Sequence, residues 1–205
     1  MIYYAKRASW RTFGSVNDLV EMVSEMDQRD IVASLNGDGE AYARVVQHYQ
    51  NQVAAQMWRF TRDPAILEEL VQDVFVEAYL SLKGFRGHAP FLHWLRRVAT
   101  RVGYRYWKSQ VRKRDREEAL TETSLNLAIA PEDLTPSEAS EALYSLFAKM
   151  PPPDRVVLTL FYFEECDINE IASRTGWNQT LVKVRLHRAR KKMKVLLNEA
   201  GIRRE

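Results

Sequence analysis

The chain has 205 residues, of which 46% are hydrophobic and 28% charged, a balance typical of one or two globular domains. It is too apolar to be disordered throughout, and its few glycines and prolines exclude a fibrous protein. No apolar stretch approaches the roughly 20 residues of a membrane-spanning helix, and the N-terminus lacks the apolar segment of a secretory signal. The single cysteine, Cys166, excludes an internal disulfide and a multi-thiolate zinc site. We therefore expect a reduced, cytoplasmic protein without membrane insertion.

The net charge of +3 conceals two strongly basic blocks. Residues 85–116 hold ten lysines and arginines against one acid, and residues 179–194 hold seven bases and no acid. The remainder of the chain is therefore strongly acidic. Two basic blocks in an acidic chain favour two separate contacts with a polyanion, although a solvated basic surface would have the same composition.

Strand patterns are nearly absent, so we expect an all-α protein. Residues 155–163 are composed like a short buried strand, but helical neighbours and the lack of a partner strand predict a core helix there. Asp63-Pro64 and Ala89-Pro90 each predict a helix that starts with proline at its first position. Residues 117–138 contain two prolines, six acids and no base, which predicts a flexible acidic linker.

This linker divides the chain into two helical domains. The predicted parts are an N-terminal extension of unknown role at 1–27, a domain at 28–115, the linker at 116–137 and a smaller domain at 138–205.

The helix predicted at 64–83 combines an apolar stripe with an acidic remainder. The residues expected in the core are Leu67, Leu70, Val71, Val74, Phe75, Ala78 and Leu82. The polar and acidic residues elsewhere on the helix are Glu68, Glu69, Gln72, Asp73 and Glu77. Because DNA would repel an acidic face, that face meets either solvent or a basic protein surface, and the spacing alone favours solvent.

The helix predicted at 90–114 carries the first basic block. Its buried stripe is expected to consist of Phe91, Leu95, Val98 and Val102. The opposite side holds Arg96, Arg97, Thr100, Tyr104, Trp107 and Lys108. Nucleic-acid bases stack on exposed aromatic rings, at roughly 1–3 kcal/mol each, while neighbouring cations bind phosphates. The pattern favours single-stranded or partly melted nucleic acid, and the alternative is that Tyr104 and Trp107 are buried against another helix.

Residues 167–192 have the spacing of a helix-turn-helix motif. Asp167 with Glu170 forms a capping box, Gly176 supplies the turn, and Asn178 is a suitable N-cap for the second helix. In such motifs the second helix enters the major groove of DNA.

The second helix of this motif is amphipathic and basic. The residues expected to pack inward are Val182, Leu186, Ala189 and Met193. The residues expected to contact DNA are Lys183, Val184, His187, Arg188 and Lys191. A basic amphipathic helix could also bind a membrane or an acidic protein, but the capped helix and glycine turn before it favour DNA.

Signatures of catalysis are missing from the chain. There is no phosphate-binding glycine-rich loop, no HExxH or GxSxG motif and no Cys/His cluster. We therefore expect no enzyme activity, no metal and no cofactor.

Four runs of residues, taken in order, resemble the extracytoplasmic-function (ECF, group 4) sigma factors of the sigma-70 family. The runs are Asp30–Tyr49, Leu67–Tyr79, Phe85–Ala99 and Met150–Lys192. The resemblance covers about 28–114 and 138–197. It implies a helical domain like sigma region 2, followed by a helix-turn-helix domain like sigma region 4.

The resemblance also implies roles for individual residues. The implied contacts with core RNA polymerase are Glu69, Gln72, Asp73 and Phe75. The implied contacts with the melted promoter −10 element are Phe85, Arg86, His88, Arg97, Arg101, Tyr104, Trp107 and Lys108. The loop Phe85–Pro90 would capture a flipped base, helix 179–192 would recognise the −35 element, and the linker would thread through polymerase channels.

The sequence departs from the family pattern at three places. Arg101 stands where the family often has Asn, at the flipped-base pocket. Thr180-Leu181-Val182 replaces the usual Gly-Thr-Val, and Val184 offers an apolar contact suited to a thymine methyl group.

The sequence therefore predicts a transcription initiation factor that binds core RNA polymerase and promoter DNA. An anti-sigma factor is a further expected partner, because factors of this class are commonly held by one. Two alternatives remain: a helix-turn-helix regulator that acts without polymerase, and a nucleic-acid-processing enzyme, which the lack of a catalytic constellation disfavours.

Overall fold

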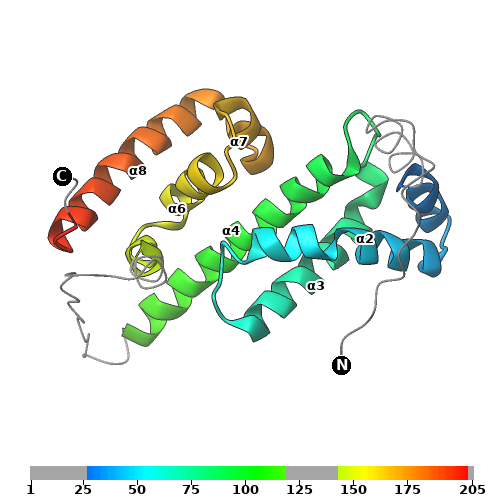
Figure 1. Cartoon of the computed structure of the whole chain (residues 1–205), viewed down its shortest axis with the longest axis horizontal. Coiled ribbons are helices and arrows are strands. Elements are labelled where there is room, and N and C mark those ends of the chain that lie inside the picture. Colours follow the sequence, from blue (N-terminus) through cyan, green and yellow to red (C-terminus); the bar gives the residue numbers. More distant parts are fainter. Residues whose placement is uncertain (1–26, 119–142, 203–205) are drawn as a thin grey trace, which may run out of the picture.

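The computed structural model describes residues 27–118 and 143–202, and within these ranges all regular structure is helical (Figure 1). The predicted N-terminal extension, except for residue 27, lies outside the described residues, as does the predicted linker beyond 118. No helix in the two described ranges is long and apolar enough to cross a membrane.

The first domain begins with a helix over residues 27–35, followed by α2 (Gly39–Met57), α3 (Pro64–Ser81), the short η1 (Leu82–Gly84) and α4 (Phe91–Glu118). Asp63 caps α3 by accepting hydrogen bonds from the next two backbone N–H groups after Pro64, so the predicted helix start is confirmed. α4 begins one residue after the predicted Pro90 and continues to Glu118, so the first residues of the predicted linker are helical.

The second domain contains a helix over residues 143–148, then α6 (Pro152–Leu158), the π-helix η2 (Thr159–Phe163), α7 (Ile168–Thr175) and α8 (Gln179–Glu199). Residues 155–163 are thus helical, as predicted. The helix-turn-helix boundaries are also confirmed. Asp167 accepts from the N–H of Glu170, Gly176 ends α7 with φ 77°, and Asn178 accepts from the N–H of Leu181.

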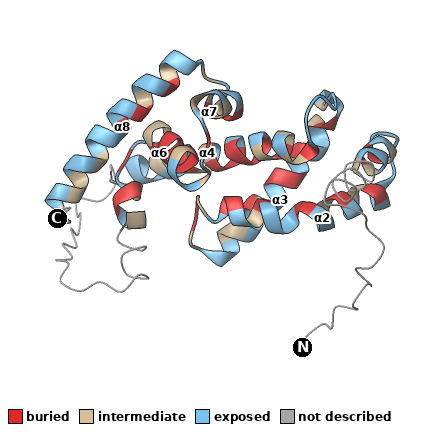
Figure 2. Ribbon diagram, turned by 45° about the horizontal axis from the view of Figure 1, so that its top comes forward, coloured by how far each residue is buried: buried red, intermediate tan, exposed pale blue. Residues whose placement is uncertain are grey.

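α4 is the central element of the molecule. It packs against α2 and α3 within the first domain and against α6 and α7 of the second domain (Figure 1). Figure 2 shows buried residues along α4, whereas most of α8 is exposed. The predicted stripe of α4 is confirmed, since Phe91, Leu95, Val98 and Val102 are all buried. α4 therefore carries the core of the first domain and also the contact between the domains.

The close approach of Phe60 to α4 depends on a glycine. The ring of Phe60, which is 1% exposed, lies directly over Gly103. A Cβ atom at position 103 would overlap this ring, well inside van der Waals contact. Because Phe60 is buried and also packs against Trp107, with 4.4 Å between ring centroids, it has little room to move away.

We expect Gly103→Ala to destabilise the protein. Overpacking a core costs about 1–3 kcal/mol, which exceeds the gain of about 1 kcal/mol from replacing glycine inside a helix. Urea unfolding, followed by circular dichroism, measures the change. Gly39→Ala is the matched control, since a Cβ there meets no atom within 4 Å. An unfolding midpoint for Gly103→Ala at or above that of the wild type would contradict the packing.

Candidate nucleic-acid interface

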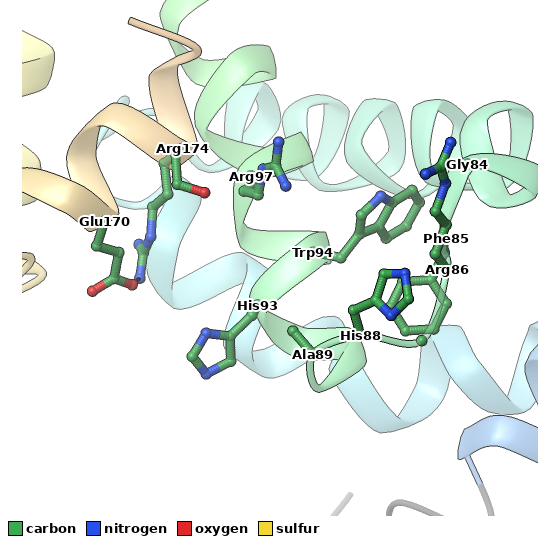
Figure 3. Close-up of a pocket in the computed structure, with 12 residues that line it drawn as sticks. Gly84, Phe85, Arg86, His88, Ala89, His93, Trp94, Arg97, Glu170 and Arg174 are labelled. Carbon is green, nitrogen blue, oxygen red and sulfur yellow. Dashed lines mark hydrogen bonds and ion pairs between the residues drawn. The ribbon is translucent and has the colours of Figure 1, made fainter. Parts of the chain in front are cut away.

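A cavity of about 300 Å³ lies between the loop before α4, the first turns of α4, and α7 (Figure 3). Its lining from the first domain comprises Gly84, Phe85, Arg86, Gly87, His88, Ala89, His93, Trp94 and Arg97. Its lining from α7 comprises Glu170, Ser173 and Arg174. The cavity thus combines aromatic rings with several cationic side chains, as a site for a base and its phosphate requires.

Aromatic packing holds the loop against α4. The ring of Phe85 packs edge-on against Phe91, with 5.3 Å between centroids, and contacts Trp94 at 5.7 Å. Gly87 has φ 70°, a left-handed conformation that glycine adopts without strain. Because its ring packs against Phe91 and Trp94, Phe85 is half-buried and forms a wall of the cavity. Arg86 and His88 are exposed beside it.

The exposed basic face of α4 agrees in part with the predicted one. Arg97, Arg101 and Lys108 are exposed. The ammonium of Lys108 lies 5.7 Å from the ring centroid of Tyr104. Tyr104 is half-buried, because its ring packs edge-on against Trp177 of the second domain at 5.8 Å.

The prediction that Trp107 lies on the outer face of α4 is wrong. Trp107 is 2% exposed, and its indole Nε1–H donates to the carbonyl of Phe60 at 2.8 Å. The guanidinium of Arg155 from α6 stacks on the same ring at 4.0 Å. Thr100, expected on that face, is also buried. The helical pattern assumed one buried side, but α4 packs on two, so burial against another segment is the correct interpretation of Trp107.

The outer face of α8 agrees with the prediction. Val182, Leu186 and Ala189 are buried, and Met193 is half-buried against the core. The five predicted DNA contacts are all exposed, namely Lys183, Val184, His187, Arg188 and Lys191. Val184 is 41% exposed, so its methyl groups are accessible to a base edge.

The acidic face of α3 needs one correction. Glu69, Gln72 and Asp73 are exposed, but Phe75 is 6% exposed, and its carbonyl accepts from the hydroxyl of Tyr42 at 2.5 Å. Phe75 therefore belongs to the core, as its helical spacing predicted, and its side chain does not lie on the exposed face where the resemblance placed it.

Three exposed apolar side chains of α3 were missed at the sequence level. Val76 is 59% exposed, Tyr79 46% and Leu80 77%. Helical spacing places Val76 and Leu80 on the same face as Glu69 and Asp73. The sequence pattern that could have predicted their exposure is this continuation of the acidic face by apolar residues. An apolar patch with an acidic border is typical of a protein-binding surface.

Comparison with known proteins identifies the family. Sigma-70 region 2 matches residues 45–113, and sigma-70 region 4 matches residues 140–193. The RNA polymerase sigma factor YlaC of Bacillus subtilis is 31% identical over 153 residues, which cover 72% of this chain and 86% of YlaC. This chain belongs to the sigma-70 family of RNA polymerase sigma factors.

Other relatives agree with this assignment and indicate the ECF group. The ECF RNA polymerase sigma-E factor of Haemophilus influenzae is 28% identical to this chain. The match covers 80% of this chain and 91% of the length of the Haemophilus protein. The probable RNA polymerase sigma factor RfaY of Xanthomonas campestris is 32% identical over 75% of this chain, which spans 40% of the length of RfaY. The chain is thus an ECF sigma factor, a protein that directs RNA polymerase to promoters.

A solved structure supports the same fold. CnrH, in complex with the cytosolic domain of CnrY, has a TM-score of 0.54 and 22% sequence identity with this chain. The match covers 85% of this chain and 98% of CnrH. The helical architecture of this sigma factor is therefore shared with CnrH.

Among the described residues of this sigma factor, no three His, Cys, Asp or Glu side chains lie close enough together to hold a metal ion. Cys166 is 2% exposed, and its thiol contacts the backbone carbonyl of Glu164 at 3.5 Å. Burial is the main cause that raises the pKa of the Cys166 thiol to about 12. The thiol is therefore protonated at neutral pH and is not an activated nucleophile.

We expect Cys166 to react with a thiol reagent such as DTNB only after unfolding. Because thiolate is the reactive form and the folded pKa is raised, native reactivity stays low from pH 7 to pH 9, whereas the unfolded thiol ionises within this range. Absorbance at 412 nm measures the rate in buffer and in 6 M guanidinium. A native rate close to the denatured rate would show that the thiol is accessible.

Proposed function

We propose that this sigma factor binds core RNA polymerase through the exposed face of α3, recognises −35 duplex DNA with α8, and holds the melted −10 strand beside α4. The domain at 28–115 is proposed to bind polymerase and the −10 element, and the domain at 138–205 is proposed to bind the −35 element. The observation that carries the proposal is that the two basic blocks form exposed faces on two different helices, one of which borders an aromatic cavity.

The −10 strand is proposed to enter the cavity in front of Phe85 and Trp94. These rings would stack on an unpaired base, while Arg86 and Arg97 bind the adjacent phosphates. His88 and Arg101 are proposed to contribute further along the strand. Tyr104 and Lys108 extend the same exposed face of α4, and their cation–π contact already aligns a cation with a ring.

The −35 element is proposed to bind the outer face of α8. Lys183 and Val184 lie in the first turns, where a helix in the major groove meets base edges, and His187, Arg188 and Lys191 follow along the same face. Several phosphates are neutralised together, so binding is expected to weaken steeply with salt.

The polymerase contact is proposed to combine Glu69, Gln72 and Asp73 with Val76 and Leu80. An anti-sigma factor is proposed as a second protein partner, because CnrH is bound to the cytosolic domain of CnrY, and RpoE of Bartonella quintana is bound to the anti-sigma factor NepR. The polymerase-independent regulator is the alternative, and no observation favours it over the family assignment.

The purified protein should co-elute with bacterial core RNA polymerase in size exclusion at moderate salt. Leu80→Glu should weaken this complex about tenfold or more, which corresponds to about 1.4 kcal/mol, because it places a charge in an apolar contact. Val195→Glu is the control, since Val195 is 49% exposed on α8, outside the proposed contact. Separate elution of the folded wild type from a cognate core polymerase would favour the polymerase-independent regulator.

Arg188→Ala should weaken −35 recognition by about 1–3 kcal/mol if the guanidinium contacts a guanine. The substrate is a promoter selected from a randomised library with the assembled holoenzyme, tested with its −35 element intact and scrambled. The ratio of the transcription rate with the intact −35 element to the rate with the scrambled element should fall for Arg188→Ala. It should stay unchanged for Lys194→Ala, which removes an exposed cation nearer the end of α8. An undiminished ratio for Arg188→Ala would remove this residue from the −35 contact.

A further inference from the structure

A second, smaller cavity lies where the segment after α2 meets the second domain. Its volume is about 80 Å³. The rings of Trp107 and Phe163 belong to its walls, and three arginines line it, namely Arg59 and Arg62 from the first domain and Arg155 from α6. Its lining within the described ranges includes no aspartate or glutamate. The cavity therefore gathers positive charge between apolar walls.

Arg155 is a buried cation without a counter-charge in the described part of the chain. The residue is 6% exposed, its guanidinium stacks on the ring of Trp107 at 4.0 Å, and it donates to the hydroxyl of Tyr144. That hydroxyl donates in turn to the carbonyl of Phe60 at 3.3 Å. Within residues 27–118 and 143–202, the Nε–H of Arg155 has no hydrogen-bond partner. A buried charge without a partner is costly, so an anion beside Arg155 would be stabilising.

The other charged group near Arg155 increases this cost. Burial is the main cause that lowers the pKa of the Arg155 guanidinium, and the positive charge of Arg114 lowers the pKa further. A bound anion would counteract both effects, since it attracts the protonated guanidinium and replaces part of the lost hydration.

Arg59 lines the same cavity and is also incompletely paired. Its Nε lies 3.7 Å from a carboxylate oxygen of Glu164, which is too far for a hydrogen bond, and no other described group accepts from this Nε–H. The carboxylate of Glu164 also lies 3.6 Å from the guanidinium of Arg174. One negative charge is thus shared between two arginines, and the charge of Arg59 is only partly balanced.

The volume and chemistry of the cavity indicate the class of ligand. A water molecule takes about 30 Å³ in the liquid, so the cavity has room for a small polyatomic group but not for a nucleotide or a DNA phosphate with its two sugars. Guanidinium groups bind phosphate oxygens through paired N–H···O bonds. Apolar walls exclude water, which strengthens these charge-assisted bonds. A small phosphate-type oxyanion meets all of these conditions.

We propose that this cavity binds free phosphate, held between the guanidinium of Arg155 and that of Arg59, with Arg62 as a third positive charge. None of the side chains proposed to bind DNA or polymerase lines the cavity. Arg59 and Arg155 belong to different domains, so one phosphate joins the segment after α2 to α6. Because the site requires the folded chain, phosphate stabilises the protein against unfolding.

Nuclear magnetic resonance of the ¹⁵N-labelled full-length protein tests the site directly. Sodium phosphate is titrated at neutral pH and constant ionic strength, with sodium chloride as the balancing salt. The Nε–H signals of Arg155 and Arg59, assigned through their loss in Arg155→Lys and Arg59→Gln, should shift together and saturate with one dissociation constant. Sodium sulfate should produce the same saturation, because it presents the same tetrahedral oxygens. Phosphate should also raise the thermal unfolding midpoint of the wild type above that in chloride.

The variants distinguish this site from general screening of charge. Arg59→Gln changes a side chain that is 39% exposed, so folding should be preserved, and it should weaken phosphate affinity about tenfold or more through loss of a charge-assisted bond. Arg155→Lys keeps the charge but removes the planar guanidinium, and it should weaken affinity by a similar factor. Arg29→Gln is the matched control, since Arg29 is exposed on the helix over residues 27–35 and outside the cavity, and it should bind like the wild type.

Three results would overturn the proposal. The first is that the two arginine signals do not move during the phosphate titration. The second is that Arg59→Gln and Arg29→Gln bind phosphate equally well, because phosphate would then bind elsewhere. The third is that chloride alone produces the same shifts, which would show ionic screening without an oxyanion site. None of these measurements uses DNA or polymerase, so their failure would leave the proposed role in transcription unchanged.

Discussion

The burial of α4 along two faces is the constraint on which the rest of this structure depends. Its apolar stripe, with Leu95 and Val98 fully buried, forms the core of the first domain together with α2 and α3. Its second buried surface centres on Trp107, whose indole N–H donates to the Phe60 carbonyl and whose ring stacks with the Arg155 guanidinium. A single helix thus anchors the first domain and positions the second.

This double burial explains why polar groups occur inside the contact between the domains. Arg155 is almost completely buried, and desolvation lowers the pKa of its guanidinium to about 10, so it remains protonated at neutral pH. Its stacking on Trp107 offsets part of the cost of burying this charge. A contact built from arginines, aromatic rings and one bridging glutamate resembles a transient protein interface more than a domain core.

The arrangement places opposite demands on the same residues. The cavity proposed to bind the −10 strand needs accessible rings and cations, and the loop with Phe85 and Arg86 provides them on one side. The contact between the two domains uses Tyr104 and the cavity rim for packing against Trp177 and α7. α8 is different, because its basic outer face stays exposed in this arrangement. The two proposed DNA-binding surfaces therefore differ in accessibility within one conformation.

The sequence by itself determined the helices, their caps and the outer face of α8, because these depend on neighbours within one or two turns. Asp63, Asp167, Gly176 and Asn178 act through local backbone hydrogen bonds and dihedral angles. Four ordered motifs were also enough to indicate the sigma-70 family. Only the tertiary structure decided the environments of Trp107 and Trp177. A helical pattern shows which residues share a face, but it does not show how many faces meet another part of the chain. That number depends on contacts between residues far apart in sequence, such as Trp107 with Arg155 and Tyr104 with Trp177.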